Sequence, residues 1–246
     1  MRSLRLALQF LTIFPVRVGG EVSTTDLRAS LACFPLVGLL IGGAMAAVAQ
    51  AGLQGRLGCL LLVAAGVLIT GCLHLDGLAN LADACCARKG REGRLAVMKD
   101  PRIGAAGACA LVLALLLRWE MTASLSGKPL WRALLAAPVL GRSVMVLTLR
   151  FLAPARPEGE GLARSWGPPS AFASALALGT ILLLPAFLIG SPAGFGVSGL
   201  SLMAMTLVAA LAWRMLGGVT GDVCGAAGEM AELAALGGFV LWGSSL

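Results

Sequence analysis

The sequence has few charged residues, no tyrosine and a single histidine. Charged residues make up 13% of its 246 residues and hydrophobic residues 58%, whereas soluble domains contain about 25% charged residues. No polar stretch is long enough to form a separate soluble domain. A soluble globular fold is therefore excluded, and we expect one membrane-embedded domain over residues 1–246.

The sequence also lacks the signatures of several functional classes. It has no Walker A loop and no glycine-rich dinucleotide fingerprint, which excludes nucleotide binding by those soluble folds. Its seven cysteines form no C-x-x-C pair, and their odd number does not indicate a disulfide framework. The net charge of +7 comes with few aromatic residues and no basic helix outside the expected membrane loops, so we expect no nucleic-acid partner.

Long apolar runs dominate the sequence instead. Runs of about 20 residues are long enough to cross a hydrocarbon core about 30 Å thick. They predict an all-α, polytopic integral membrane protein with six to seven transmembrane helices, at residues 31–51, 57–75, 103–117, 130–151, 171–189 and 197–213, and a partial span at 233–246. Residues 1–14 place two arginines ahead of apolar side chains, which favours an amphipathic helix at the membrane interface.

The distribution of basic residues predicts an orientation. Residues 76–102 form a connector with six bases, and alternating spans put most other bases on the same side. The opposite side receives only Arg56, Arg118, Lys128 and Arg132. Because connectors rich in Lys and Arg stay in the cytoplasm, we expect this connector and the acidic motifs to face the cytoplasm.

The segment T-G-C-L-H-L-D-G-L-A-N-L-A-D at residues 70–83 contains an acidic stripe. On a helix, Asp76, Asn80 and Asp83 share one face. Their neighbours are small or aliphatic, so the stripe has no packing role, although Asp76 would also suit a helix N-cap. Mg²⁺ prefers a few carboxylates together with water and substrate phosphates. We therefore interpret Asp76 and Asp83 as metal ligands and catalytic residues, and Asn80 as a substrate contact.

A second acidic stripe lies in G-G-V-T-G-D-V-C-G-A-A-G-E-M-A-E at residues 217–232. Asp222 and Glu229 are seven residues apart and share a helix face. The glycines around them allow another backbone or a ligand to come close. Ionisable groups at span edges are costly and favour a function. Asp222 and Glu229 are thus predicted to join the first stripe around one or two divalent cations, the alternative being solvated acids that balance nearby bases.

Basic residues follow the first stripe in R-L-A-V-M-K-D-P-R-I-G-A-A-G at residues 94–107. Arg94, Lys99 and Arg102 have the donors to bind a diphosphate, but bases beside a span also act as topology determinants. Arg142 lies inside an expected span and needs either an acidic partner or an anionic substrate. His74 is a candidate general base or metal ligand, or it is simply hydrogen-bonded at the span boundary.

These residue types favour phosphoryl transfer from a nucleotide-diphosphate donor to a hydroxyl. Metal ions bridge diphosphate oxygens and neutralise the leaving nucleotide, while basic side chains stabilise charge at phosphorus. A membrane transporter is the alternative from a different class, favoured by the glycine-rich spans and by Arg142. Transporter sites lie near mid-membrane and often accompany internal repeats, whereas these acids gather at one face and no repeat is evident.

The chain resembles the adenosylcobinamide-GDP ribazoletransferase, or cobalamin synthase, family over almost its full length. Besides the segments at residues 74–83, 94–107 and 217–229, the similarity rests on L-T-I-F-P-V at 11–16, F-P-L-V-G-L-L-I-G at 34–42, G-R at 141–142 and E-G-L at 160–162. The resemblance implies a Mg²⁺-dependent enzyme of the inner membrane. Such an enzyme joins adenosylcobinamide-GDP to α-ribazole or its 5′-phosphate and releases GMP.

CDP-alcohol phosphotransferases of lipid metabolism also use paired acidic motifs in membrane helices, but Asp76-Gly77 lacks the upstream Asp and the Arg of their D-x-x-D-G-x-x-A-R pattern. The sequence also leaves open whether the chain forms a homo-oligomer in the lipid bilayer.

The family pattern D-G-L-A-D has Asp where this sequence has Asn80. An amide oxygen can coordinate a metal but brings no charge. The negative charge that binds the metal would then come from the carboxylates of Asp76, Asp83, Asp222 and Glu229. We expect the enzyme to be active with a raised Mg²⁺ requirement, and its Asn80→Asp variant to need less. Mg²⁺ titrations of the two proteins test this, and superimposable curves would remove any role for the exchange.

Overall fold

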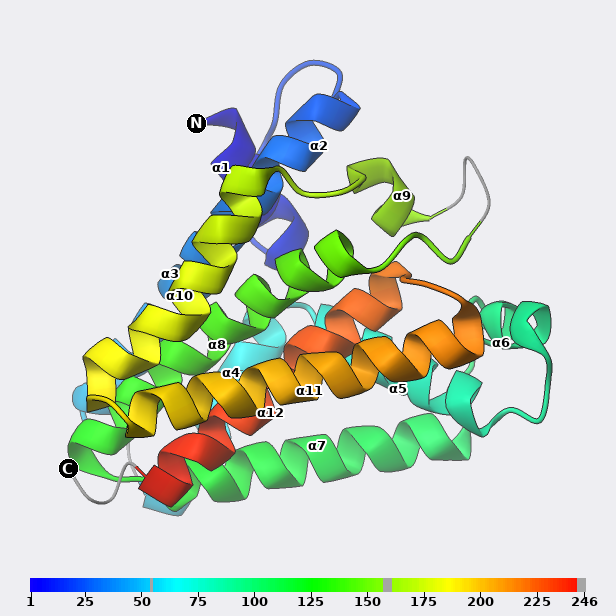
Figure 1. The fold of residues 1–246 in the computed structure, drawn as a ribbon. Coiled ribbons are helices and arrows are strands. Elements are labelled where there is room, and N and C mark those ends of the chain that lie inside the picture. The colour runs from blue at the N-terminus through cyan, green and yellow to red at the C-terminus, as the bar shows by residue number, and fades with distance from the viewer. Residues whose placement is uncertain (54, 157–160, 243–246) are drawn as a thin grey trace.

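The computed structural model describes residues 1–53, 55–156 and 161–242, and within these ranges every regular element is a helix. The helices are α1 (Arg2–Leu11), α2 (Thr24–Ser30), the 3-10 turn η1 (Leu31–Cys33), α3 (Phe34–Gln50), α4 (Gly55–Ile69), α5 (Leu73–Cys86), α6 (Arg91–Val97), α7 (Ala105–Ala123), α8 (Gly127–Phe151), α9 (Leu162–Trp166), α10 (Ala171–Ile189), α11 (Ala193–Leu216) and α12 (Gly221–Trp242). The predicted all-α class is confirmed (Figure 1).

Six helical segments in the described part of the chain are long and apolar enough to cross a membrane, and the α4–α5 pair makes seven if it counts as one span. This agrees with the predicted polytopic membrane protein. The α10 helix has the predicted bounds, and α1 forms with its arginines exposed and with Leu6, Ala7 and Leu11 buried. The position of α1 at a membrane interface stays a prediction.

Three predicted boundaries are wrong, and one of them is the end of α7, which continues to Ala123 and not to residue 117. The span expected at residues 57–75 ends earlier, because Gly71 and Cys72 both have positive φ and the chain then turns by 86° into α5. The expected connector at 76–102 therefore holds most of α5 and all of α6. At the other end, α12 begins at Gly221 and is a full span of 22 residues, not a partial span from residue 233. Residues 243–246 of that prediction lie outside the described ranges.

The central element is α8, which is mostly buried and which contacts α3, α10 and α12. The α3 and α8 helices come close because Gly38 and Gly42 have no side chain. A Cβ added at Gly38 or Gly42 would lie 2.5 Å from the carbonyl oxygen of Pro138 or Leu135. In contrast, α7 is largely exposed along its apolar length, as expected of a helix at the lipid boundary.

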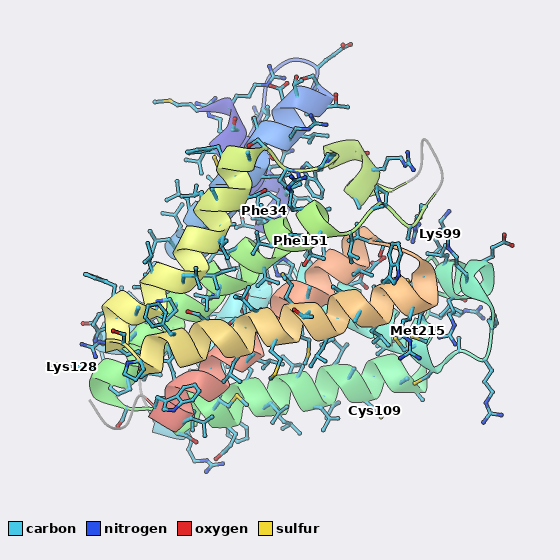
Figure 2. The ribbon with its side chains drawn as sticks, viewed as in Figure 1. Phe34, Lys99, Cys109, Lys128, Phe151 and Met215 are labelled. Atoms are coloured by element: carbon cyan, nitrogen blue, oxygen red, sulfur yellow. The ribbon has the colours of Figure 1, made fainter. Side chains whose placement is uncertain are left out.

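The bundle has two ends that the sequence analysis put on opposite sides of the membrane. Figure 1 shows α6 at one end of α11, close to where α5 and α7 meet. Lys99, between α6 and α7, lies at this end, whereas Lys128, at the start of α8, lies at the opposite end (Figure 2). We use the position of Lys99 to define the Lys99 end of the bundle.

The contact between α3 and α8 predicts different effects of one substitution at neighbouring positions. Gly42→Ala should lower stability by about 1–3 kcal/mol, because the new Cβ meets a backbone that cannot move aside easily. Gly43→Ala should leave stability unchanged or raise it by up to about 1 kcal/mol, because its nearest neighbour is a side-chain atom 3.9 Å away. Thermal unfolding in detergent measures both, and equal midpoints would contradict this packing.

Candidate active site

The two acidic motifs meet where α5 crosses α12. At this crossing, a Cβ added to Gly77 would lie 2.6 Å from the backbone oxygen of Asp222, and one added to Gly225 would lie 3.3 Å from the Cα of His74. Glycine at these two positions lets the helix backbones approach more closely than larger residues would allow. The crossing brings the side chains of the two motifs within reach of each other.

Asn80 connects the two acidic motifs directly. Its amide nitrogen donates to Asp76 Oδ2 at 3.1 Å and to Asp222 Oδ1 at 3.2 Å. The Asp222 carboxylate also accepts from the Thr220 hydroxyl at 3.4 Å, and its side chain is 22% exposed. Asp76, a turn away on α5, is exposed. Two carboxylates that share one hydrogen-bond donor are close enough to bind a common ligand.

The donor set at this point fits a small hard cation. No group of three or more His, Cys, Asp or Glu side chains is arranged to bind a metal among the described residues. Mg²⁺ does not need such a group, because it is usually held by one or two carboxylates, several waters and substrate phosphates. Asp76 and Asp222 meet that requirement. The Asn80 amide would add a neutral oxygen if it turned by half a rotation about its terminal bond.

A cavity of about 860 Å³ opens beside these three residues. Asp76, Asn80 and Asp222 line one part of it, together with four bases, Lys99, Arg102, Arg156 and Arg164. Another part is apolar, with side chains that include Phe10, Leu73, Ile103, Leu111 and Leu115. Its size is in the range of small-molecule and cofactor sites. The cavity can therefore receive an amphiphilic, anionic ligand.

Asp83 lies outside this cavity and has a structural role. Its carboxylate accepts the backbone N–H groups of Gly104 at 2.7 Å and Gly107 at 2.8 Å. These are the N-cap and a first-turn residue of α7, so Asp83 caps α7 from a neighbouring helix. Both carboxylate oxygens are engaged. The sequence predicted that Asp83 would join Asp76 and Asp222. The structure instead holds the Asp83 carboxylate at the start of α7.

Glu229 also lies apart from the acidic pair, in a buried charge quartet made of Arg118, Arg142, Glu229 and Glu232. Arg118 donates to Glu229 at 2.5 Å and to Glu232 at 2.7 Å, and Arg142 forms a salt bridge with Glu232. Arg142 is 1% exposed and Glu229 4%. Glu229 is two turns along α12 from Asp222, about 10 Å by helical rise. The structure therefore separates Glu229 from the candidate metal site.

The quartet selects one of the two alternatives predicted for Arg142 and corrects the expected position of Arg118. Arg142 has the acidic partner that one alternative predicted, Glu232, and its side chain does not line the large cavity. Arg118 does not belong to a connector, since α7 continues to Ala123 and the Arg118 side chain is only 13% exposed. Both guanidinium groups have carboxylate partners in an apolar setting, although the buried Nε of Arg142 has no hydrogen-bond partner among the described residues.

His74 lies between the large cavity and the charge quartet. It is 3% exposed, and it lines both the large cavity and a small one of about 40 Å³ beside Arg118, Arg142, Glu229 and Glu232. Its Nε2 atom has no hydrogen-bond partner among the described residues. This buried imidazole has an acceptor or donor still available to a ligand.

The three bases singled out in the sequence have different surroundings. Arg94 donates to the carbonyl oxygens of Ala84, Cys85 and Lys89 at 2.8–2.9 Å, so it caps the carboxyl end of α5 and does not line the cavity. Lys99 and Arg102 do line it. Hydrogen bonds from Arg102 at 2.7–2.9 Å lower the pKa of Asp100 to about 2. Asp100 is thus ionised at neutral pH and offsets part of the positive charge of the cavity.

Arg156 and Arg164 line the cavity, although in the sequence they indicated only the orientation of the spans. Both come from the connector between α8 and α10. Arg156 lies 3.9 Å from the Asp222 carboxylate. The signal available in the sequence was a pair of arginines within a stretch of proline and glycine, on the side predicted to hold the acidic motifs.

The different environments of Asp76 and Asp83 predict different effects of the same substitution on stability. Asp83→Ala should lower stability by about 1–2 kcal/mol, because two backbone N–H groups of α7 lose their acceptor. Asp76→Ala should change stability by less than about 0.5 kcal/mol, because its side chain is exposed. Thermal unfolding without divalent cations measures both; a larger loss at Asp76 would contradict the assignment of Asp83 as a cap.

Comparisons with known proteins agree on one family. The family model described as cobalamin-5-phosphate synthase matches residues 3–240. The adenosylcobinamide-GDP ribazoletransferase of Pseudomonas paraeruginosa is 39% identical over 245 residues, 96% of either chain. Proteins of that name from Azorhizobium caulinodans and Chlorobium chlorochromatii are 40% and 38% identical, over 96% and 93% of this chain and 94% and 91% of theirs. No solved structure matches the chain. Because the match includes both acidic motifs, the chain belongs to the cobalamin-5-phosphate synthase family.

Proposed function

We propose that this chain joins adenosylcobinamide-GDP to α-ribazole or α-ribazole 5′-phosphate and releases GMP. The observation that carries the proposal is the contact of Asn80 with both Asp76 and Asp222, at the wall of a cavity that also holds four bases. Carboxylates beside bases suit a metal-assisted transfer from a diphosphate. The printed names of the relatives supply the substrates.

In the proposed reaction, a ribazole hydroxyl attacks the phosphorus bonded to the cobinamide side. A new P–O bond forms to ribazole, the P–O bond to GMP breaks, and the hydroxyl proton leaves. A bound Mg²⁺ would neutralise the diphosphate and the leaving GMP. Asp76 and Asp222 would hold this ion, while Lys99 and Arg102 stabilise negative charge on the transferred group.

His74 is the proposed acceptor of the hydroxyl proton. It lines the cavity, and its Nε2 atom has no partner among the described residues. A neutral, buried imidazole in this position is suited to general-base chemistry.

We also propose that the enzyme lies in the inner membrane with its cavity open to the cytoplasm. The cavity includes Lys99 and therefore belongs to the Lys99 end of the bundle, where the predicted basic connector lies (Figure 2). The positive-inside rule supports the cytoplasmic side for this end. A site at one end of the bundle favours an enzyme over a transporter, which binds near the bilayer midplane.

Release of GMP by the purified protein tests the proposed reaction. Given adenosylcobinamide-GDP and α-ribazole, the protein should release GMP in the presence of Mg²⁺. The release should stop when EDTA removes the ion. Asp76→Asn and Asp222→Asn should each lower kcat by about 100-fold or more, the size of effect seen on loss of one charge-stabilising group. A transporter would release no GMP under either condition.

Glu120→Gln provides the matched control for these variants. Glu120 is an exposed acid on α7, 3.2 Å from Arg56 and outside the cavity. Its loss should leave GMP release within about twofold, as expected of a surface salt bridge. If Glu120→Gln were as inactive as Asp222→Asn, the effect would not be specific to the acidic pair, and the proposed site would be wrong.

A further inference from the structure

Arg156 is a cavity residue to which the proposed reaction gives no role. Its side chain is 15% exposed, and the nearer atom of its guanidinium is 3.9 Å from Asp222, too far for a hydrogen bond. Its Nε atom is buried and has no hydrogen-bond partner among the described residues. A guanidinium has five donors in a planar fork that matches phosphate oxygens. A loosely paired arginine in a cavity therefore has the donors to bind an anionic ligand.

The position of Arg156 is fixed by the backbone on both sides of the cavity. The N–H of Ala155 donates to the carbonyl of Val219 at 2.9 Å, and the N–H of Val219 donates to the carbonyl of Ala153 at 2.8 Å. Arg91 donates to the carbonyls of Ala155 at 2.9 Å and Leu216 at 2.7 Å. These bonds hold the segment before Arg156 against the segment before Asp222.

A second arginine supports the same wall of the cavity. Arg164 lines the cavity and donates to the backbone carbonyl of Arg156 at 3.3 Å. Both arginines belong to the connector between α8 and α10, Arg156 near its start and Arg164 within α9, and neither lies in the two acidic motifs. Positive charge therefore lies next to Asp222 as well as at Lys99 and Arg102.

We infer that Arg156 binds the diphosphate of the nucleotide substrate and that Asp222 is its alternative partner. This inference rests on the proposed function. Without a ligand, Arg156 offsets the charge of Asp222. Once Asp222 binds a divalent cation, its charge is neutralised and the guanidinium is free to make bidentate hydrogen bonds to phosphate. Arg156 and the cation thus compete for Asp222 before the nucleotide binds and act together on the nucleotide afterwards.

Binding measurements on the purified full chain in detergent test this exchange, with GDP and Mg²⁺ as probes. In the presence of Mg²⁺, Arg156→Gln should weaken GDP binding by about 10- to 100-fold, because a charge-assisted bidentate contact is lost. Without nucleotide, the same variant should bind Mg²⁺ more tightly, because Asp222 loses its competing cation. Isothermal titration measures both affinities. Because the affinity for GDP should fall while the affinity for Mg²⁺ rises, the pair of measurements distinguishes ligand binding from a structural role.

Arg150→Gln is the matched control for loss of one positive charge. Arg150 is exposed at the carboxyl end of α8, six residues before Arg156, and does not line the cavity. Its substitution should leave both affinities within about twofold. Arg156→Lys keeps the charge without the planar fork and should weaken GDP binding by several-fold. If Arg156→Gln does not fold, GDP binding by Arg156→Lys is the test.

Each result has a distinct meaning. Wild-type affinity for GDP in Arg156→Gln or Arg156→Lys would overturn the inference, and so would a parallel loss of GDP and Mg²⁺ affinity in a folded variant. If the wild type releases GMP but binds GDP independently of Arg156, this inference fails and the proposed function stands. If GDP binding depends on Arg156 but no GMP is released from adenosylcobinamide-GDP, the proposed function fails and the nucleotide site stands.

Discussion

The close crossing of α5 and α12 is the constraint on which the candidate site depends. Gly77 contacts the backbone of Asp222, and Gly225 contacts that of His74. Only at this separation does one side chain, Asn80, reach both Asp76 and Asp222. The site is therefore a product of helix packing, and residues that set the distance between two backbones are as important as those with functional groups.

The α12 helix carries two groups of acidic residues with different tasks. Asp222, in its first turn, faces the cavity, whereas Glu229 and Glu232 lie deeper and pair with arginines of α7 and α8. The deeper salt bridges fix α12 against two neighbouring helices, and the crossing with α5 then presents Asp222 to the cavity. His74 lines both the large cavity and the small cavity beside the charge quartet, so one side chain adjoins the candidate site and the salt bridges that hold α12.

The sequence predicted the membrane fold from the length of its apolar runs, and it predicted that the two acidic motifs meet from the cost of ionisable groups at span edges. It did not predict the bend after Ile69, since the apolar run continues through a turn made by two residues with positive φ. A spacing of seven residues puts Asp222 and Glu229 on one face but says nothing about depth. Over about 10 Å, one carboxylate faces the cavity and the other a buried arginine. The partners of Asp83 and Arg94 were backbone groups, which a side-chain pattern does not reveal.

The charge quartet has a consequence for how this chain tolerates substitution. It contains two guanidinium groups and two carboxylates, so loss of any one member strands a charge in an apolar interior, whereas loss of an opposite pair does not. An arginine of α7 or α8 and a glutamate of α12 can then be exchanged only together. We therefore expect a change of charge in one of these helices to be tolerated only together with a compensating change in another.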